Sequence, residues 1–334
     1  TACRWDAIGG LVNLGRSSGE AIGRGGGIPG ISDDGNSISS SIISSDSLVT
    51  IGLWTKGVGW TELMPPPPAD RGNMDEQYGT AWGITGDGTG VVGLYWRPEA
   101  VWPDGPAHAC IGFGTGGVVD LGSRYANGRA NGADFDGDVV VGWTEDPFGT
   151  WQPTVWEGGT ITVLSETNAM CDAWAVNGPG TVIVGTAIDS VSGPLPVRAA
   201  AMWVRDQSGW QEQILGYLPG TFGNAVGNVV GKDLTDNATV VVGINSYDNW
   251  NHAGFVWTPV LGMVKADDFF ADHGVTFPAG FAIHAVTGVS RDGRTFVGYG
   301  AEAVWGAPTR SFIVTIPAVA GVPGARNLSG LVLG

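Results

Sequence analysis

The aspartates of one short segment have the clearest capacity for chemistry in this chain. Asp134, Asp136 and Asp138 alternate around Gly137. Alternate oxygen ligands around a glycine turn suit Ca²⁺. The segment lacks the acidic residue that closes an EF-hand loop, and an Asp-Gly hairpin turn explains the same residues. A weak calcium site, with no other cofactor, and a plain hairpin turn therefore both stay open.

Catalytic chemistry has little support elsewhere. Aspartates recur at similar places in the chain, at Asp33, Asp87, Asp136 and Asp292. Each belongs to an expected hairpin turn, where an Asp side chain bonds its own backbone. A propeller glycosidase would need two carboxylates facing one substrate, and no such pair is singled out. No nucleophile elbow, zinc-binding helix or phosphate loop is present, so we predict no catalytic residue and no enzyme.

The tryptophans divide into two groups. Four recur at one position of a repeated strand: Trp54, Trp156, Trp203 and Trp257. A large aromatic at a fixed strand position favours core packing over a carbohydrate platform. Trp102, Trp151 and Trp250 instead lie in expected loops beside Asn, Pro and Asp, and these three are candidate glycan contacts.

One pattern occurs six times and positions these residues. It consists of a small-residue run, a tight polar turn, a Val/Ile-rich strand ending in Gly, and a Trp- or Phe-bearing strand. The turns fall at Gly35, Gly88, Gly137, Gly180, Asn237 and Gly293. A repeat of roughly 50 residues with four strand-sized segments is typical of propeller blades. We therefore predict an all-β fold, a β-propeller of six blades with four antiparallel strands each.

The ends of the chain bear on the blade count. Residues 3–15 resemble a third and a fourth strand without a preceding hairpin, and the last repeat, 284–317, has a hairpin and a third strand. Pairing the N-terminal with the C-terminal strands closes a ring of six and removes sheet edges. Seven blades stay open if an end pairs differently. We expect a single propeller domain over residues 1–317.

The segment 318–334 combines a Gly/Pro-containing linker with an apolar, uncharged end. Its apolar side chains are Leu328, Leu331, Val332 and Leu333. A frayed terminus or the start of a sorting segment explains such a tail. The alternative is a strand donated to a neighbouring copy, with these four residues as the assembly contacts.

Composition excludes several partners. The 334 residues carry a net charge of −16, and only 14% are charged. Nucleic acid and anionic membranes both require a basic footprint, so neither is an expected partner. No apolar stretch has the length of a membrane-spanning helix. A lightly charged, acidic chain favours an extracellular or cell-surface location.

Two stretches of sequence point to a family. The segment Ala253 to Val264 reads A-G-F-V-W-T-P-V-L-G-M-V, and Gly288 to Tyr299 reads G-V-S-R-D-G-R-T-F-V-G-Y. They resemble the bacterial HAF-type extracellular repeats, which join I-S-x-D-G-x-x-x-V-G to A-F-x-W-T-x-x-x-G-M-x-x-L. The resemblance covers most of residues 30–317. It implies a secreted, propeller-like protein of bacterial origin without a defined enzymatic activity.

Three functions stay open. We favour a non-enzymatic secreted structural protein that self-assembles into an extracellular filament or a surface or biofilm-matrix layer, with copies of itself as partners. The alternative is a carbohydrate-binding propeller with extracellular polysaccharide as its partner. A polysaccharide-acting hydrolase comes third, because propellers host many chemistries.

Overall fold

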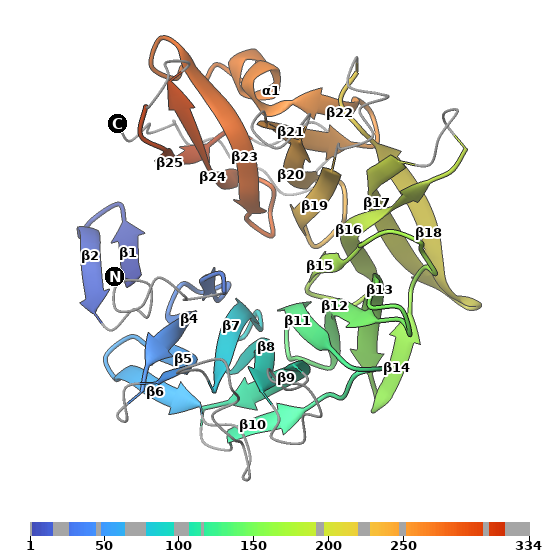
Figure 1. Cartoon of the computed structure of the whole chain (residues 1–334). Coiled ribbons are helices and arrows are strands. Elements are labelled where there is room, and N and C mark those ends of the chain that lie inside the picture. The colour runs from blue at the N-terminus through green and yellow to red at the C-terminus, as the bar shows by residue number, and fades with distance from the viewer. Residues whose placement is uncertain are drawn as a thin grey trace. The chain divides into compact units, whose positions relative to one another are not determined.

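The chain is a six-bladed β-propeller, as the sequence predicts, and its described residues include one short helix (Figure 1). The computed structural model describes residues 2–15, 27–44, 48–63, 78–96, 107–114, 117–191, 197–219, 228–246, 252–302 and 307–317. It forms two compact units, Thr1–Val163 (unit 1) and Leu164–Gly334 (unit 2), and each is described by itself. Within these ranges no helix is long and apolar enough to cross a membrane.

Unit 1 contains three blades and a separate N-terminal hairpin. Its strands are β1 (Ala2–Asp6), β2 (Gly10–Gly15), β3 (Gly30–Ile31), β4 (Ser37–Ile43), β5 (Val49–Thr55), β6 (Gly59–Leu63), β7 (Gly79–Ile84), β8 (Gly90–Trp96), β9 (Ala107–Phe113), β10 (Gly117–Asp120), β11 (Gly128–Ala133), β12 (Val139–Glu145), β13 (Trp151–Glu157) and β14 (Thr160–Val163). The strands β3–β6, β7–β10 and β11–β14 form three four-stranded antiparallel sheets in sequence order. Strands β1 and β2 pair with each other.

Unit 2 contains the other three blades. Its elements are β15 (Ala173–Val176), β16 (Val182–Asp189), β17 (Val197–Asp206), β18 (Gly209–Gly216), β19 (Asn228–Leu234), β20 (Val241–Ser246), β21 (His252–Thr258), β22 (Gly262–Lys265), α1 (Ala266–Asp272), β23 (Phe281–Val289), β24 (Thr295–Glu302) and β25 (Arg310–Thr315). Strands β15–β18 and β19–β22 form four-stranded sheets, and β23–β25 form a sheet of three.

The way the ring closes stays a prediction. In the described residues β1 and β2 make a two-stranded sheet, and β25 stands at the edge of the last sheet. Three expectations therefore stay predictions: the pairing of residues 3–15 with the last repeat, the single domain 1–317, and a tail beyond it. The tail 318–334 lies outside the described residues.

Three of the four recurrent tryptophans are buried in the core, as their position predicts. Trp156, Trp203 and Trp257 on the third strands are at most 8% exposed. Trp156 lies among apolar residues of two neighbouring blades of unit 1, including Val92 of β8. Burying such a ring removes apolar surface from water and stabilises the contact between blades. Trp54 is only partly buried.

A polar lock holds the turn between the first and second strands of every blade, which we call the inner turn. The first turn residue carries an oxygen that accepts a hydrogen bond from the backbone N–H five residues later. The six locks are Ser32 to Ser37, Thr85 to Gly90, Asp134 to Val139, Asn177 to Val182, Thr235 to Val240 and Ser290 to Thr295, with N···O distances of 2.9 to 3.1 Å. This contact satisfies a donor that the turn would otherwise leave unpaired.

The polar locks correct two of the residue equivalences between blades that the sequence predicts. Asp34, not Asp33, is the equivalent of Asp87, because its Oδ1 accepts bonds from the Ser32 hydroxyl at 2.7 Å and from a backbone N–H two residues on. In the fifth blade Ala238, not Asn237, stands at the glycine position, with φ of 52°. Both errors are shifts by one residue, because the sequence letters alone do not show which oxygen closes each turn.

A glycine on the second strand allows close packing inside five of the blades. Its equivalents are Gly93, Gly142, Gly185, Gly243 and Gly298. A Cβ at Gly142 would lie 1.9 Å from the carbonyl oxygen of Arg129 on the neighbouring inner strand. Ladder pairing shifts there, between Ala130 and Gly132. In these five blades the glycine of the Val/Ile-rich strand is therefore required because two backbones approach closely, and not because the chain turns there.

Candidate functional site

A β-bulge interrupts the innermost strand at the same place in five blades. The residue that the pairing register skips is Thr287 in the last blade, and in the other four it is Trp82, Asn131, Trp174 or Lys232. A bulge re-aims one side chain away from the regular alternation of a strand, and bulges are frequent next to binding sites. These four residues are therefore the starting point for a functional site in each unit.

In unit 1 the bulges lead to a cation enclosed by aromatic rings, the Arg129 cluster. The Arg129 guanidinium carbon lies 3.6 Å from the ring centroid of Trp82, and 5.5 and 5.6 Å from those of Trp143 and Trp151. Its Nε donates a hydrogen bond of 2.7 Å to Asn131 Oδ1. Arg129 is only 7% exposed, so the rings and the amide compensate a nearly buried charge.

Trp151 belongs to this cluster, but not as the sequence suggests. It was expected in a loop; it is the first residue of β13, paired with Glu145. Its ring stacks on Trp143 with a centroid distance of 4.3 Å and an interplanar angle of 6°. Trp82 and Trp151 remain partly exposed. The partly exposed rings offer flat apolar surface beside groups that form hydrogen bonds.

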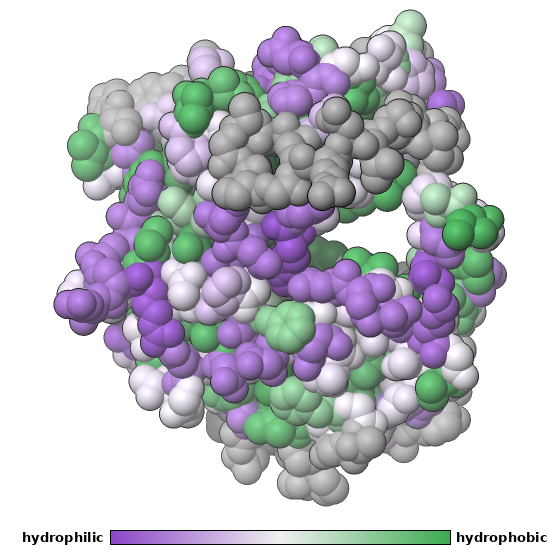
Figure 2. Space-filling view, turned by 180° about the vertical axis from the view of Figure 1, so that it is seen from behind, coloured by the Kyte–Doolittle hydropathy of each residue, from purple (hydrophilic) through white to green (hydrophobic). Residues whose placement is uncertain are grey.

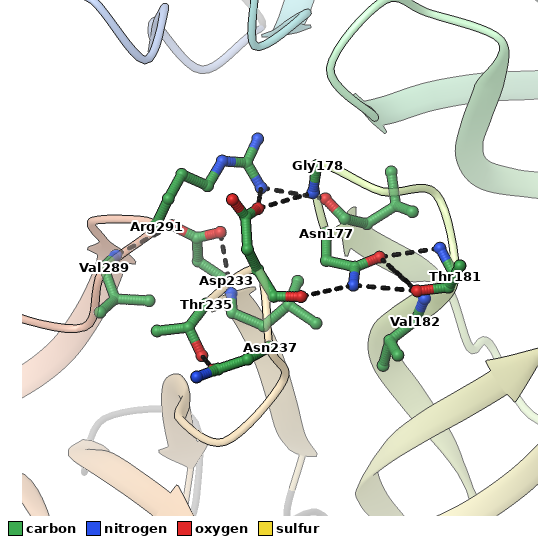
Figure 3. A network of polar contacts seen from close by, with 12 residues as sticks. Asn177, Gly178, Thr181, Val182, Asp233, Thr235, Asn237, Val289 and Arg291 are labelled. Atoms are coloured by element: carbon green, nitrogen blue, oxygen red, sulfur yellow. Dashed lines mark hydrogen bonds and ion pairs between the residues drawn. The ribbon is translucent and has the colours of Figure 1, made fainter. Parts of the chain in front are cut away.

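In unit 2 a network of polar contacts joins the inner turns of three blades (Figure 3). Asn177 Nδ2 donates to the Asp236 carbonyl at 2.8 Å, and the Gly178 N–H donates to Asp236 Oδ1 at 2.9 Å. From the next turn, Arg291 Nη1 lies 3.7 Å from Asp236 Oδ1 and donates to the carbonyl of Val176 at 3.4 Å. The contacts hold three loops in one position, and no sequence signal marked Arg291 for this role.

Asp233 extends the same network. Its Oδ2 accepts a hydrogen bond of 2.9 Å from the N–H of Val289, on the innermost strand of the next blade. Beside it, Lys232 Nζ lies 3.0 Å from the ring centroid of Trp174. Lysine and tryptophan thus meet here through a cation–π contact between neighbouring inner strands. The contacts of this network join one part of the chain to another, so the network positions the inner turns and strands.

The calcium candidate serves its hairpin turn. Asp134 Oδ1 accepts from the N–H groups of Gly137 and Val139 at 2.9 and 3.1 Å, and Asp136 Oδ1 accepts from that of Asp138. Burial raises the pKa of Asp134. No group of three His, Cys, Asp or Glu side chains in the described ranges is arranged to hold a metal ion. The hydrogen bonds of Asp134 and Asp136 are those of a hairpin turn, and the calcium site stays a prediction.

One histidine–carboxylate pair exists on the third and fourth strands of the second blade. His108 Nδ1 lies 3.1 Å from Asp120 Oδ1. Burial opposes ionisation of Asp120, but hydrogen bonds from His108, the Gly122 N–H and Tyr95 outweigh it and lower its pKa to about 2. The neighbouring Cys110 is fully buried, and burial raises its pKa, so it is no nucleophile. The pair therefore holds the third strand of this blade to the fourth.

The remaining predicted site residues are not tested. The described ranges do not include Trp102, Trp250, Leu328, Leu331, Val332 and Leu333. On the face shown in Figure 2, hydrophilic and hydrophobic residues are intermixed rather than gathered in one apolar patch. Scattered exposed apolar side chains are normal for a protein surface and mark no site by themselves.

Comparison with known proteins places the fold among propellers. No protein-family model and no curated protein sequence matches the chain. The acylaminoacyl peptidase of Pyrococcus horikoshii is similar in structure, with a TM-score of 0.54, 10% identity, and coverage of 93% of this chain and 46% of that one. The β-propeller domain of the Trilobed protease from Pyrococcus furiosus gives 0.52 and 11%, covering 86% and 80%. TolB from Acinetobacter baumannii gives 0.44 and 13%, covering 69% and 51%. At identities this low the two matches with TM-scores above 0.5 show the fold alone, and the TolB match carries no argument.

Proposed function

We propose that the chain is a non-enzymatic secreted structural protein of the HAF-repeat type, and that it self-assembles outside the cell by strand addition. The observation that supports this most directly is the last sheet. It ends at β25 after three strands, whereas the other five blades have four in the described residues. An edge strand presents unpaired N–H and C=O groups, which a strand of another chain pairs with readily. In this proposal the added strand takes the place that residues 3–15 would take in a closed ring.

The side chains of β25 suit such an addition. Phe312 and Val314 are buried in the core of the blade, while Arg310 and Ser311 are exposed. One face is thus already fixed against the propeller, and an added strand needs only to continue the sheet. The donor in this proposal is the apolar tail of a neighbouring copy, with Leu328, Leu331, Val332 and Leu333 as its contacts.

The N-terminal hairpin supplies a second incomplete sheet. Ile8, Leu11 and Val12 are 101%, 72% and 41% exposed. A two-stranded sheet is marginally stable alone, and here the Trp60 Nε1–H bond to the Leu14 carbonyl, at 2.8 Å, links it to β6. A neighbouring copy would cover these apolar side chains in an assembly of this kind.

Electron microscopy and size-exclusion chromatography test the proposal. We expect the intact chain to form regular fibres or sheets, and a variant lacking residues 327–334 to be a folded monomer. Ser311→Lys places a charge on the exposed face of β25 and should also reduce assembly, because edge lysines oppose strand pairing. Dispersed monomers of the intact chain at all concentrations would refute self-assembly, and fibres that survive both changes would refute strand addition at β25.

A carbohydrate-binding function is the second candidate, and the Arg129 cluster is what favours it. We expect a polysaccharide ligand to quench tryptophan fluorescence through the partly exposed rings of Trp82 and Trp151. Trp151→Ala should weaken such binding about tenfold, since stacking aromatics contribute roughly 1–3 kcal/mol where they dominate a contact. Quenching that is unchanged in this variant would exclude the cluster. Fold similarity to peptidase propellers by itself supports no hydrolase.

A further inference from the structure

We propose that unit 2 contains a binding site for a small organic ammonium ion, in a cavity between α1 and the beginning of β23. The cavity has a volume of about 440 Å³. This falls within the range of roughly 300–1,000 Å³ found for small-molecule sites. Its wall consists of Asp267, Ala271 and residues 274–281. None of these residues takes part in the networks described above.

The apolar part of the wall is fixed by the core of the last blade. Phe277 stacks on Phe281, with a centroid distance of 5.4 Å and an interplanar angle of 11°. Phe277 also meets Phe312 of β25 edge to face at 5.4 Å. Both rings pack against the buried cluster that contains Phe270 of α1. These contacts fix the shape of the wall before a ligand binds. Binding therefore loses no affinity through ordering of the wall.

Asp267 supplies the polar group of the cavity. It is the one charged residue in the lining, and its Oδ1 accepts a 3.2 Å hydrogen bond from the N–H of Ile283. Its carboxylate also accepts a hydrogen bond from the Asp267 N–H. A carboxylate can accept about four hydrogen bonds, so it keeps acceptor capacity for a ligand. Burial raises the pKa of Asp267, which is consistent with a carboxylate partly removed from water.

Charge complementarity identifies the occupant as a cation. The next charged residues on α1, Asp268 and Asp272, are also acidic, and no basic residue lines the cavity. Lys265, directly before α1, is exposed and is a basic residue whose charge acts on Asp267. An anion would be repelled by this acidic set. An ammonium group donates a charge-assisted hydrogen bond to a carboxylate oxygen, roughly twice as strong as a neutral one. The aromatic wall accommodates an apolar body attached to that group and tolerates the positive charge.

Calorimetric titration of the intact chain with a matched pair of ligands tests the site. The probe is 2-phenylethylammonium, and the control is the neutral 2-phenylethanol, which has the same aromatic body. We expect the ammonium ion to bind at least about tenfold more tightly, because a hydrogen bond to a charged group contributes about 1.5–3 kcal/mol. Equal affinity for the two ligands, or no binding of the ammonium ion, would overturn the proposal.

Two variants tie the binding to the cavity. Asp267→Asn keeps an acceptor for the Ile283 N–H but removes the charge, so affinity for the ammonium ion should fall to that of the alcohol. Thr276→Lys, at an exposed lining position, places an internal ammonium group beside Asp267 and should abolish binding without disturbing the core. Val260→Lys adds the same charge at a turn outside the cavity and should leave binding unchanged. Binding that persists in both cavity variants, with thermal unfolding unaltered, would place the ligand elsewhere and refute the site.

Discussion

The two hairpin turns of each blade follow different rules. The inner turn, between the first and second strands, has a side-chain lock in all six blades. The outer turn, between the third and fourth strands of five blades, does not share one such lock, and a glycine with positive φ stands at or just before the start of the fourth strand. Those glycines are Gly59, Gly117, Gly159, Gly209 and Gly262. Apolar residues at outer turns also face solvent, as Val58 and Val260 do at 76% and 84% exposure.

The difference between the inner and outer turns follows from what each turn contacts. Inner turns contact the next blade: the Asp33 N–H donates to the carbonyl of Gly86 at 2.9 Å, and the Gly86 N–H donates to that of Asp134 at 3.2 Å. In unit 2 the network of Figure 3 makes equivalent contacts. A turn that supports a neighbour needs one fixed conformation, whereas a turn in solvent needs only a chain reversal. Stability should therefore depend far more on the inner than on the outer half of each blade.

The largest effect is expected from Gly142→Ala, on the inner half of the third blade. The new Cβ would lie 1.9 Å from the Arg129 carbonyl oxygen and 2.9 Å from the Ala130 Cα, so strands β11 and β12 must separate. We expect a loss of about 3 kcal/mol or more in the free energy of unfolding, since backbone cannot yield as a side chain can. Denaturant unfolding followed by circular dichroism measures it.

Gly114→Ala is the matched control on the outer half of a blade. Among the described residues its Cβ would meet the Leu53 side chain alone, at an ordinary contact distance of 3.5 Å. We expect a change within about 0.5 kcal/mol, as for most surface substitutions. If the two alanine variants unfold at the same denaturant concentration, the close approach on the inner half does not constrain the fold.

A smaller loss is expected from breaking one polar lock. Thr85 is fully buried, accepts from the Gly90 N–H at 2.9 Å and donates to Asp87 Oδ1 at 2.6 Å. Thr85→Val keeps the shape but leaves that N–H unpaired, so unfolding should become easier by about 1–3 kcal/mol. Thr85→Ser retains the hydroxyl and should recover most of the loss. On the outer turn, Val58→Thr should change stability little; a comparable loss there would contradict the contrast between the turns.

The sequence predicted the repeat and its geometry because periodic strands and turn residues are local signals. Blade number and the packing of the recurrent tryptophans follow from them. The Arg129 cluster could not be predicted, since it joins Trp82 of one blade to Trp151 of the next, and it includes two bulge residues, Trp82 and Asn131. The cavity beside Asp267 depends likewise on how a loop folds back over α1. Contacts between residues far apart in the sequence do not produce a periodic pattern in it.

The smallest effect concerns the one inner turn that breaks the glycine rule. Ala238 has φ of 52°, and the described ranges contain no other residue besides glycine with positive φ. A left-handed conformation costs an L-residue roughly 1–2 kcal/mol, and the extra chain entropy of glycine offsets part of this. Ala238→Gly should therefore stabilise unit 2 by about 0.5–1 kcal/mol, measured as a raised midpoint of thermal unfolding. The reverse change in the next blade, Gly293→Ala at φ of 73°, should destabilise it by a similar amount. If both substitutions lower the midpoint, then contacts of the Ala238 methyl group outweigh backbone strain, and the fifth inner turn is stabilised differently from the other five.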